Sequence, residues 1–246
     1  MVRGVVKIVS LTVVTLLVLG SSYTAVHVLP PLIESVVVAQ KTIPFQTESK
    51  DRNMLVIGDS TAYGIGAYHP ADSTAGRVST ALDLGVENRA RSGARTREMV
   101  LQLNRAREKY YDLILIQVGA NDVMKFSSIE KTANELDAAL SRAHELSDRV
   151  VLLTATDIGS APIWPRLLGD VYSRRTKELR DEFIEVSERY GAEYVDIFSD
   201  IDLFEVNFDL YYTPDTAHPS SDGYALWAMD ILESIQSRWP EFYERS

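Results

Sequence analysis

From Asn53 onward, apolar runs of strand length alternate with longer amphipathic stretches. The short runs predict five strands, at 54–57, near Val86, at 113–118, at 150–154 and at 194–197. The amphipathic stretches predict helices at 74–84, 95–110, 129–146, 169–190 and 221–239. This alternation is typical of a parallel sheet covered by helices on its faces. We therefore expect an α/β domain with a five-stranded parallel sheet, whose ligands bind outside the carboxyl ends of the strands.

A different apolar pattern lies at the amino terminus. Arg3 and Lys7 precede residues 8–28, a stretch without Asp, Glu, Lys or Arg. At about 1.5 Å per residue, such a helix is long enough to span the hydrocarbon core of a bilayer. The two basic residues predict that the first residues stay in the cytoplasm and that the rest of the chain is exported. A cleaved signal peptide is the alternative, with 8–19 as its apolar core and 37–39 as its cleavage site.

Pro30 and Pro31 predict the end of this apolar helix. The residues after them mix polar, charged and short apolar pieces, which is typical of a linker. We therefore expect a signal-anchor or transmembrane segment at 1–29, a linker at 30–52 and the folded domain at 53–246. The expected location is membrane-anchored with an extracytoplasmic domain, or secreted or periplasmic if the segment is cleaved.

The composition narrows the partners of the domain. A formal net charge of -10 without a long basic cluster argues against binding of nucleic acid through its phosphates. Small-molecule, lipid or glycan substrates fit this charge better. The chain has no cysteine, so disulfides and thiolate zinc sites are excluded.

Ser60 is the first candidate for chemistry. It lies in the run GDS at 58–60, directly after the first predicted strand. A serine hydroxyl needs a neighbouring base to become nucleophilic, and the imidazole of His218 suits that role. Asp215 lies three residues before His218. A turn of that length brings the carboxylate back to the imidazole, where it can hold the ring and stabilise the imidazolium that forms.

A serine nucleophile also needs hydrogen-bond donors for the oxyanion of its tetrahedral intermediate. Gly93 precedes a predicted helix and offers a backbone N–H with no side chain in the way. Asn121 follows the third predicted strand and offers a side-chain amide. The N–H of Ser60 is the third candidate donor.

Four short blocks carry a resemblance to a known family: GDS at 58–60, Gly93, GAND at 119–122 and DTAH at 215–218. They resemble the sequence blocks of the SGNH hydrolases, also called the GDSL esterase/lipase family, over roughly residues 53–239. The resemblance implies a flavodoxin-like three-layer α/β/α sandwich that needs no metal or organic cofactor. Thr61 stands where the family name has leucine, a position without a chemical role. The rival G-x-S-x-G elbow lacks its second glycine here.

The resemblance also implies a role for each residue. Ser60 is expected to be the nucleophile, His218 the base and Asp215 the residue that orients it. Ser60, Gly93 and Asn121 are expected to form the oxyanion hole. The expected activity is that of a serine esterase or lipase. The alternatives are an O-acetyl esterase or acyltransferase acting on cell-envelope glycans, and a non-catalytic envelope binding module. A flavin or nucleotide binder is disfavoured because no phosphate-binding Gly-rich loop follows the first strand.

Four further polar residues have weaker signals. Asp59 is expected to brace the turn after the first strand rather than react. His69 follows Ser60 closely and is a candidate for the rim of the site. His27 lies in the apolar leader, and His144 lies on a predicted helix, where a structural or solvated histidine is the expected reading.

Two segments are candidates for the walls of the site. Residues 157–168, with Pro162, Trp164 and Pro165, have the composition of a cover beside a site or of an ordinary packed loop. A second group precedes Asp215 and predicts either an acyl-pocket wall or core; it consists of Phe208, Tyr211 and Tyr212.

Overall fold

The computed structural model describes residues 20–154, 156–161, 164–200 and 207–245. Its centre is one parallel sheet of five strands in the order β2-β1-β3-β4-β5. The strands are β1 (Asn53–Gly58), β2 (Gly85–Asn88), β3 (Leu113–Gln117), β4 (Val150–Leu153) and β5 (Glu193–Tyr194). This order is that of the flavodoxin-like folds. The predicted α/β fold with a five-stranded parallel sheet is therefore confirmed.

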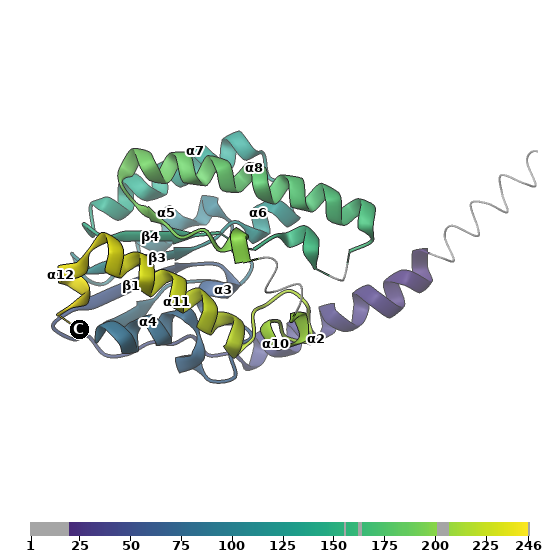
Figure 1. Ribbon diagram of the computed structural model, residues 1–246, viewed down its shortest axis with the longest axis horizontal. Helices are drawn as coiled ribbons and strands as arrows, with labels where there is room; N and C mark the ends of the chain where they lie inside the picture. The colour runs from purple at the N-terminus through teal and green to yellow at the C-terminus, as the bar shows by residue number, and fades with distance from the viewer. Residues whose placement is uncertain (1–19, 155, 162–163, 201–206, 246) are drawn as a thin grey trace, which may run out of the picture.

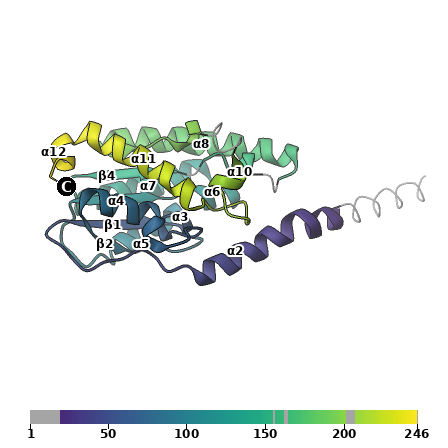
Figure 2. The same ribbon diagram turned by 60° about the horizontal axis from the view of Figure 1, so that its bottom comes forward.

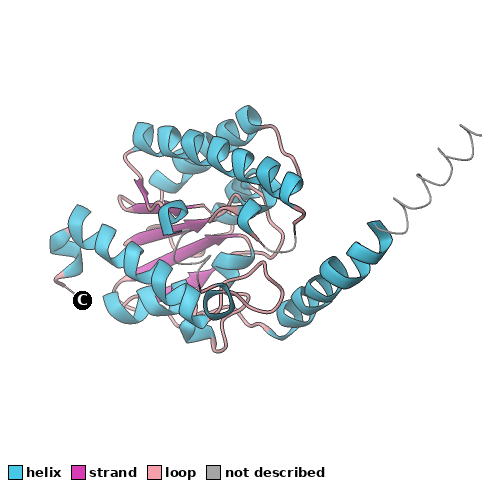
Figure 3. Cartoon of the chain, turned by 45° about the vertical axis from the view of Figure 1, so that its right-hand side comes forward, coloured by secondary structure: helices cyan, strands magenta, loops and turns pink. Residues whose placement is uncertain are grey.

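Helices cover both faces of the sheet (Figures 1 and 3). One face is covered by α5 (Met99–Leu103), α7 (Ile129–His144) and α8 (Arg166–Tyr190), and the other by α4 (Thr74–Leu82) and α11 (Ser221–Arg238). Shorter segments connect them: α3 (Ser60–Tyr63), η2 (Pro70–Asp72), η3 (Thr96–Glu98), α6 (Ala120–Met124), η4 (Ile158–Ser160), η5 (Ile197–Asp200), α10 (Phe208–Tyr211) and α12 (Pro240–Tyr243).

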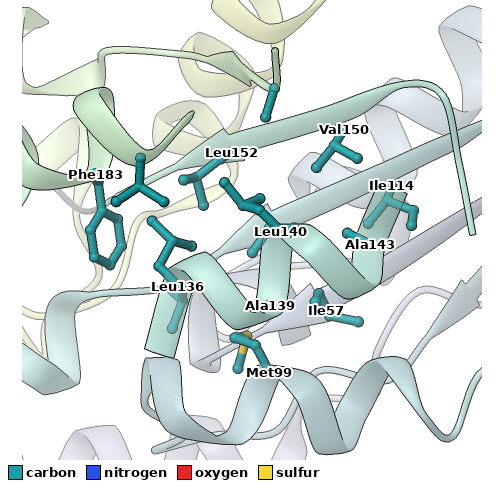
Figure 4. Close-up of a cluster of buried hydrophobic side chains, with 14 of the residues drawn as sticks. Ile57, Met99, Ile114, Leu136, Ala139, Leu140, Ala143, Val150, Leu152 and Phe183 are labelled. Carbon is teal, nitrogen blue, oxygen red and sulfur yellow. The ribbon is translucent and has the colours of Figure 1, made fainter. Parts of the chain in front are cut away.

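The alternation of side chains along the strands supplies a core on each side of the sheet. In β1, Leu55 and Ile57 belong to the cluster beneath α5, α7 and α8, and Met54 and Val56 belong to the cluster beneath α4 and α11. Successive strand residues point to opposite faces, which is why a continuous apolar run is needed here. Figure 4 shows the first cluster, in which Leu140 of α7 packs between strands and helices.

The N-terminal helix continues through both prolines, so the predicted stop at Pro30 and Pro31 is wrong. A π-helical segment, η1 (Thr24–Val28), leads directly into α2 (Leu29–Lys41). The N–H of Leu29 donates to the carbonyl of Thr24, five residues back. This wider turn relieves the clash between a proline ring and the preceding turn, so the helix accommodates the prolines instead of ending.

Residues 20–41 therefore form a single helix. By length and composition it is the one candidate membrane span within the described residues, and a signal sequence passes the same test. Residues 1–19, which include Arg3, Lys7 and most of the predicted span, lie outside the described part of the chain.

Residues 42–52 run along the edge of the sheet. The N–H of Thr47 donates to the carbonyl of Val86 (3.0 Å), and the N–H of Val86 donates to Thr47 Oγ1 (2.8 Å). Phe45 packs against the core beneath α4 and α11. These contacts cover the outer edge of β2, which otherwise offers unpaired backbone groups. They also fix the side of the domain from which α2 leaves.

One helix and one strand are shorter than predicted. The helix expected at 95–110 ends with α5, because the N–H groups of Arg107 and Glu108 donate to the Tyr111 hydroxyl instead of helix carbonyls. The last strand, expected at 194–197, consists of β5 alone. Asp196 then accepts the N–H of Phe198, which starts the turn of η5.

Candidate active site

Ser60 is the first residue of α3, immediately after β1. The carboxylate of Asp59 caps this short helix and accepts the N–H and the hydroxyl of Thr61, each at 2.9 Å. The expectation that Asp59 braces this turn is confirmed. Gly58 adopts a φ of 143°, and a Cβ there would lie 2.0 Å from the carbonyl oxygen of Gln117. Only glycine fits at this turn, which presents the Ser60 hydroxyl at the carboxyl edge of the sheet.

Gln102 fixes the end of β1 from the α5 side. Its Oε1 accepts the N–H of Gly58 (2.8 Å), and its Nε2 donates to the Gly58 carbonyl (2.9 Å). The sequence analysis missed this residue. Gln102 lies between Met99 and Leu103 on the buried face of one helix, and a polar residue in such an apolar stripe is the signal that identifies it.

The structure brings Ser60, His218 and Asp215 together from opposite ends of the domain. His218 Nε2 lies 2.9 Å from Ser60 Oγ, and His218 Nδ1 lies 2.5 Å from Asp215 Oδ2. Asp215 and His218 are both buried, whereas Ser60 is partly exposed. The three side chains form one hydrogen-bonded chain that ends at a hydroxyl reachable from solvent.

The loop that carries Asp215 and His218 is built around the Asp215 carboxylate. Asp215 Oδ1 accepts the Thr213 hydroxyl (2.6 Å) and the N–H groups of Ala217 (2.9 Å) and His218 (3.0 Å). Thr216 adopts a φ of 56°, a conformation that a β-branched residue rarely takes. The hydrogen bonds to Asp215 stabilise this strained turn and so hold the imidazole toward Ser60.

These hydrogen bonds determine the charge of Asp215. Burial alone raises the pKa of Asp215, but the hydrogen bond and positive charge of His218, with the bonds from Thr213 and Ala217, lower it to about 2. Asp215 is therefore a carboxylate at every pH at which a His–Asp pair works. It can hold a proton on His218 Nδ1 and leave Nε2 as the acceptor for the serine proton.

Asp59 is a buried carboxyl group with the opposite behaviour. Burial raises the pKa of Asp59 to about 6, and the hydrogen bonds from Thr61 and the charge of His218 offset burial only in part. The folded protein therefore binds this proton more tightly than the unfolded chain, whose pKa is the ordinary 3.8. Between these values, stability falls as the pH rises, and above pH 6 ionised Asp59 destabilises the fold by up to about 3 kcal/mol.

The Asp59→Asn variant removes this ionisation while keeping an oxygen acceptor for Thr61. We expect it to exceed the wild type in free energy of unfolding by about 2 kcal/mol at pH 8, and the difference to shrink toward pH 4, where Asp59 is protonated. Urea unfolding at several pH values measures both. A difference that is constant with pH would contradict a raised pKa for Asp59.

The two other predicted oxyanion residues line the same cavity as Ser60. Gly93 adopts a φ of 74°, and a Cβ there would meet no other atom within 4 Å. Glycine is therefore favoured at this position by its backbone conformation and not by lack of space. Asn121 is in the first turn of α6 and is buried. Asp122 joins the two segments, because its Oδ2 accepts both the N–H and the hydroxyl of Thr96, each at 2.9 Å. Asp122 is a second buried positioning residue whose role the sequence did not indicate.

A cavity of about 370 Å³ opens at this edge and is lined by Ser60, Gly93, Asn121, Asp215 and His218. Its remaining walls are largely apolar: Met124, Ile158, Ala161, Trp164 and Trp227 contribute to them. Two residues of the N-terminal helix, Pro31 and Ser35, also line it. All the predicted site residues thus converge on one cavity.

The segment at 157–168 forms one wall of this cavity. Trp164 lines the cavity, and its indole N–H donates to the carbonyl of Ile158 (2.9 Å). Asp157 accepts the hydroxyl of Ser173 on α8 (2.6 Å), which ties the wall to the domain. The segment therefore lies beside the site, as one of the two predictions for it stated. Pro162 lies outside the described residues.

The three aromatic residues before Asp215 have different positions. Tyr212 lines the cavity and its hydroxyl is 2.6 Å from that of Thr156. Phe208 stacks on Tyr212 with ring centroids 4.5 Å apart. Tyr211 packs instead against the core beneath α11. The prediction of a pocket wall thus holds for Tyr212, and that of core holds for Tyr211.

The remaining histidines lie away from the hydrogen-bonded chain. His69 is exposed, caps η2 through Nδ1 to the N–H of Ala71, and is not among the residues that line the cavity, so the rim prediction is wrong. His144 stacks on Tyr190 within the α7–α8 interface, and its pKa is lowered by burial. His27 lies in the exposed part of the N-terminal helix. In the described part of the chain, no group of three or more His, Asp or Glu could hold a metal ion.

A flavodoxin-like sheet with a serine, a histidine and an aspartate joined at its carboxyl edge belongs to an α/β class of ester-hydrolysing enzymes. Within it, residues 56–226 match the model of the GDSL-like lipase/acylhydrolase family, and the chain belongs to that family. The protein is thus an enzyme that hydrolyses esters, and the resemblance predicted from four short blocks is confirmed. No curated protein sequence matches the chain.

Solved structures support the same fold. A G-D-S-L lipolytic protein from Veillonella parvula has a TM-score of 0.62 and 16% identity, with 74% of this chain and 97% of that chain covered. A lipase/acylhydrolase from Enterococcus faecalis has a TM-score of 0.58 and 23% identity, covering 76% and 96%. The acetylxylan esterase Axe2 from Geobacillus stearothermophilus has a TM-score of 0.53 and 19% identity, covering 76% and 95%. At these identities the likeness concerns the fold.

Proposed function

We propose that the protein is a serine esterase that cleaves carboxylic esters through an acyl-enzyme on Ser60. The observation that carries this proposal is the hydrogen-bonded chain from Ser60 through His218 to Asp215, at 2.9 and 2.5 Å, at the wall of the cavity. A serine with a bonded base and a bonded carboxylate has the arrangement required for nucleophilic catalysis.

In this mechanism Ser60 Oγ attacks the ester carbonyl while His218 Nε2 takes the hydroxyl proton. The tetrahedral intermediate collapses, His218 gives that proton to the leaving alkoxide, and the acyl group stays on Ser60. Water then attacks the acyl carbon, with His218 again taking and returning the proton, and releases the carboxylic acid. Asp215 remains ionised throughout and stabilises the imidazolium of each step.

The oxyanion of each tetrahedral intermediate would face the N–H groups of Ser60 and Gly93 and the side-chain amide of Asn121. The residues that carry these donors all line the cavity. Each such donor typically contributes a few kcal/mol to lowering the barrier. Because Asn121 is buried and α6 is tied to η3 through Asp122, its position is set before substrate binds.

The cavity walls favour an apolar acyl group. Met124, Ile158, Trp164 and Trp227 can bury a hydrocarbon chain, at roughly 0.8 kcal/mol for each methylene removed from water. A second candidate is removal or transfer of O-acetyl groups on cell-envelope glycans, which the fold shared with an acetylxylan esterase supports. A panel of p-nitrophenyl esters of rising chain length and acetylated glycans separates the two, because only the first predicts a rise in kcat/KM with chain length.

A fluorophosphonate probe tests the acyl-enzyme directly. It is expected to add one phosphonyl group to the full chain, located on the peptide that contains Ser60 by mass spectrometry. Labelling on another serine, or a folded protein that neither labels nor turns over any ester, would contradict the proposal. Prior incubation with a good ester substrate should slow labelling, because both compete for the same hydroxyl.

We further propose that the catalytic domain is anchored at a membrane and faces away from the cytoplasm. The support is the apolar helix at 20–41, together with the basic residues Arg3 and Lys7 ahead of the uncharged stretch. Extraction with alkaline carbonate, with the intact mass of the membrane-bound protein, separates an anchor from a cleaved signal.

A further inference from the structure

The N-terminal helix at 20–41, which is the candidate membrane span, reaches the catalytic cavity. Pro31 and Ser35 of α2 line the same cavity as Ser60. The sequence carries no Asp, Glu, Lys or Arg from Ile8 to Ile33. At about 1.5 Å per residue, Ser35 lies roughly 3 Å along the helix beyond Ile33. If the uncharged stretch crosses the hydrocarbon core, the cavity wall formed by Ser35 lies just beyond its end, at the level of the lipid headgroups.

Exposed apolar side chains surround the cavity at the same edge. We call this set the apolar rim; it consists of Met124, Phe126, Leu167 and Leu210. Met124 lines the cavity itself, Leu167 follows the wall residue Trp164 and Leu210 precedes the wall residue Tyr212. Leu167 is 84% exposed, and several exposed apolar side chains at one edge, unlike a single one, can mark an interaction surface. Figures 1 and 2 show α6, α10 and α2 at this end of the molecule, opposite α12.

A group of cations accompanies the apolar rim in a protein with a net charge of -10. We call it the cationic group; it consists of Arg95, Lys125 and Arg175. They donate to neutral oxygens: Arg95 to the Ser127 hydroxyl, Lys125 to the Gly93 carbonyl and Arg175 to the Ser127 carbonyl. Within the described residues, no carboxylate oxygen lies within 4.0 Å of their charged nitrogens.

The cations and the apolar side chains are in contact. The Arg175 guanidinium lies over the Phe126 ring at 4.9 Å, and Phe126 itself is 51% exposed. The exposed carboxylate Glu130 lies in the first turn of α7, where the helix dipole favours it, and the exposed Asp170 lies one turn into α8. Cations that pair with no carboxylate of the described residues, beside exposed apolar and aromatic side chains, match the chemistry of an anionic lipid surface. Its headgroups take the charge and its acyl chains the apolar groups.

We propose that the carboxyl edge of the sheet docks on an anionic lipid bilayer, so that the cavity opens onto the membrane and takes its ester from a membrane lipid. The claim that the substrate is a membrane lipid rests on the proposed esterase function, whereas the claim that the domain docks on a bilayer does not. The choice of a lipid bilayer as the partner rests on two observations: the helix that forms part of the cavity wall is itself the candidate membrane span, and the cationic group complements anionic headgroups. A lipid ester then reaches Ser60 without leaving the bilayer environment.

Docking is tested by lipid quenching of a fluorophore. Because the chain has no cysteine, Leu167→Cys and Met229→Cys each carry a single site for an environment-sensitive dye. Met229 is the matched control, since it is an apolar residue, 64% exposed, on α11 outside the rim. In the full chain reconstituted into phosphatidylglycerol/phosphatidylcholine vesicles with brominated acyl chains, the dye at 167 is expected to lose at least half of its fluorescence and the dye at 229 less than a tenth. Equal quenching at both positions would overturn docking.

The substrate class is tested by comparing two esters. The double variant Leu167→Ser/Leu210→Ser is expected to lose about tenfold or more in turnover of a fluorogenic diacyl lipid held in those vesicles, and less than twofold on a water-soluble butyrate ester. The matched variant Leu101→Ser/Met229→Ser should change neither rate by more than twofold. If the rim variant loses the same factor in turnover of the lipid ester and of the butyrate ester, the proposal that the substrate comes from the membrane is refuted.

The role of charge is tested with Lys125→Gln. The wild type is expected to turn over the lipid ester several-fold faster in vesicles that contain phosphatidylglycerol than in phosphatidylcholine alone, and the variant should lose most of that difference. No effect of anionic lipid on the wild type would reject this part of the proposal. If no ester of either kind is hydrolysed, the proposed function fails, whereas the quenching result still decides docking.

Discussion

Ser60→Ala is expected to lower kcat for ester hydrolysis by about 10⁴-fold or more, with a folded protein and little change in substrate binding. The reason is that the hydroxyl 2.9 Å from His218 Nε2 is the group that forms the covalent intermediate in the proposed mechanism. Removing it leaves only direct attack by water, assisted by the oxyanion donors. The loss belongs in kcat, because the cavity walls that hold the acyl group are untouched.

The measurement is steady-state hydrolysis of a short-chain p-nitrophenyl ester, with an active-site titration of the wild type. Ser237→Ala serves as the matched control, because this serine is exposed in the last turn of α11, far from the cavity. It should retain the wild-type rate within about twofold. A Ser60→Ala enzyme with a tenth of the wild-type activity or more would show that another group is the nucleophile.

The fold was predictable because the three central strands, β1, β3 and β4, are largely continuous apolar runs. The outer strands β2 and β5 are short and carry polar residues, so their signal was weaker. The strands buried on both faces, such as β1 and β3, therefore stood out in the sequence. Interactions that the local sequence does not show explain why the predicted ends of two helices were wrong. The Tyr111 hydroxyl takes the N–H groups that a longer α5 would have used, and a π turn lets the N-terminal helix pass two prolines. Neither effect has a local sequence signal.

The candidate site was predictable for a different reason. Ser60, Gly93, Asn121, Asp215 and His218 all follow strands or lie in loops at one sheet edge, so topology brings them together. The residues that position them are buried polar side chains whose partners are distant in sequence, such as Gln102 on Gly58 and Asp122 on Thr96. The cavity walls were least predictable, since the N-terminal helix supplies two of the lining residues.

Asp215→Asn is expected to lower kcat by about 10²- to 10⁴-fold while Ser60 stays in place. The amide can keep its oxygen toward the loop, where Asp215 Oδ1 accepts three hydrogen bonds. Its NH₂ group then faces His218 Nδ1, where the structure has the carboxylate oxygen Oδ2 at 2.5 Å. His218 must then accept a proton at Nδ1 and carry its own proton on Nε2, which is the wrong tautomer for accepting the Ser60 proton.

Asp59→Asn is the matched control, because Asp59 is also a buried carboxyl group within one residue of the nucleophile but has no hydrogen bond to His218. Its loss in kcat should be below about tenfold.

The two carboxyl groups also differ in the sign of their effect on stability as the pH changes. The pKa of Asp215 is lowered to about 2, so its contribution to stability is present above pH 3.8 and is lost as the pH falls toward 2. The pKa of Asp59 is raised to about 6, so the stability of the protein falls as the pH rises from 3.8 to 6. Equal losses of activity in the two variants would mean that Asp215 acts on the fold of the loop rather than on the tautomer of His218.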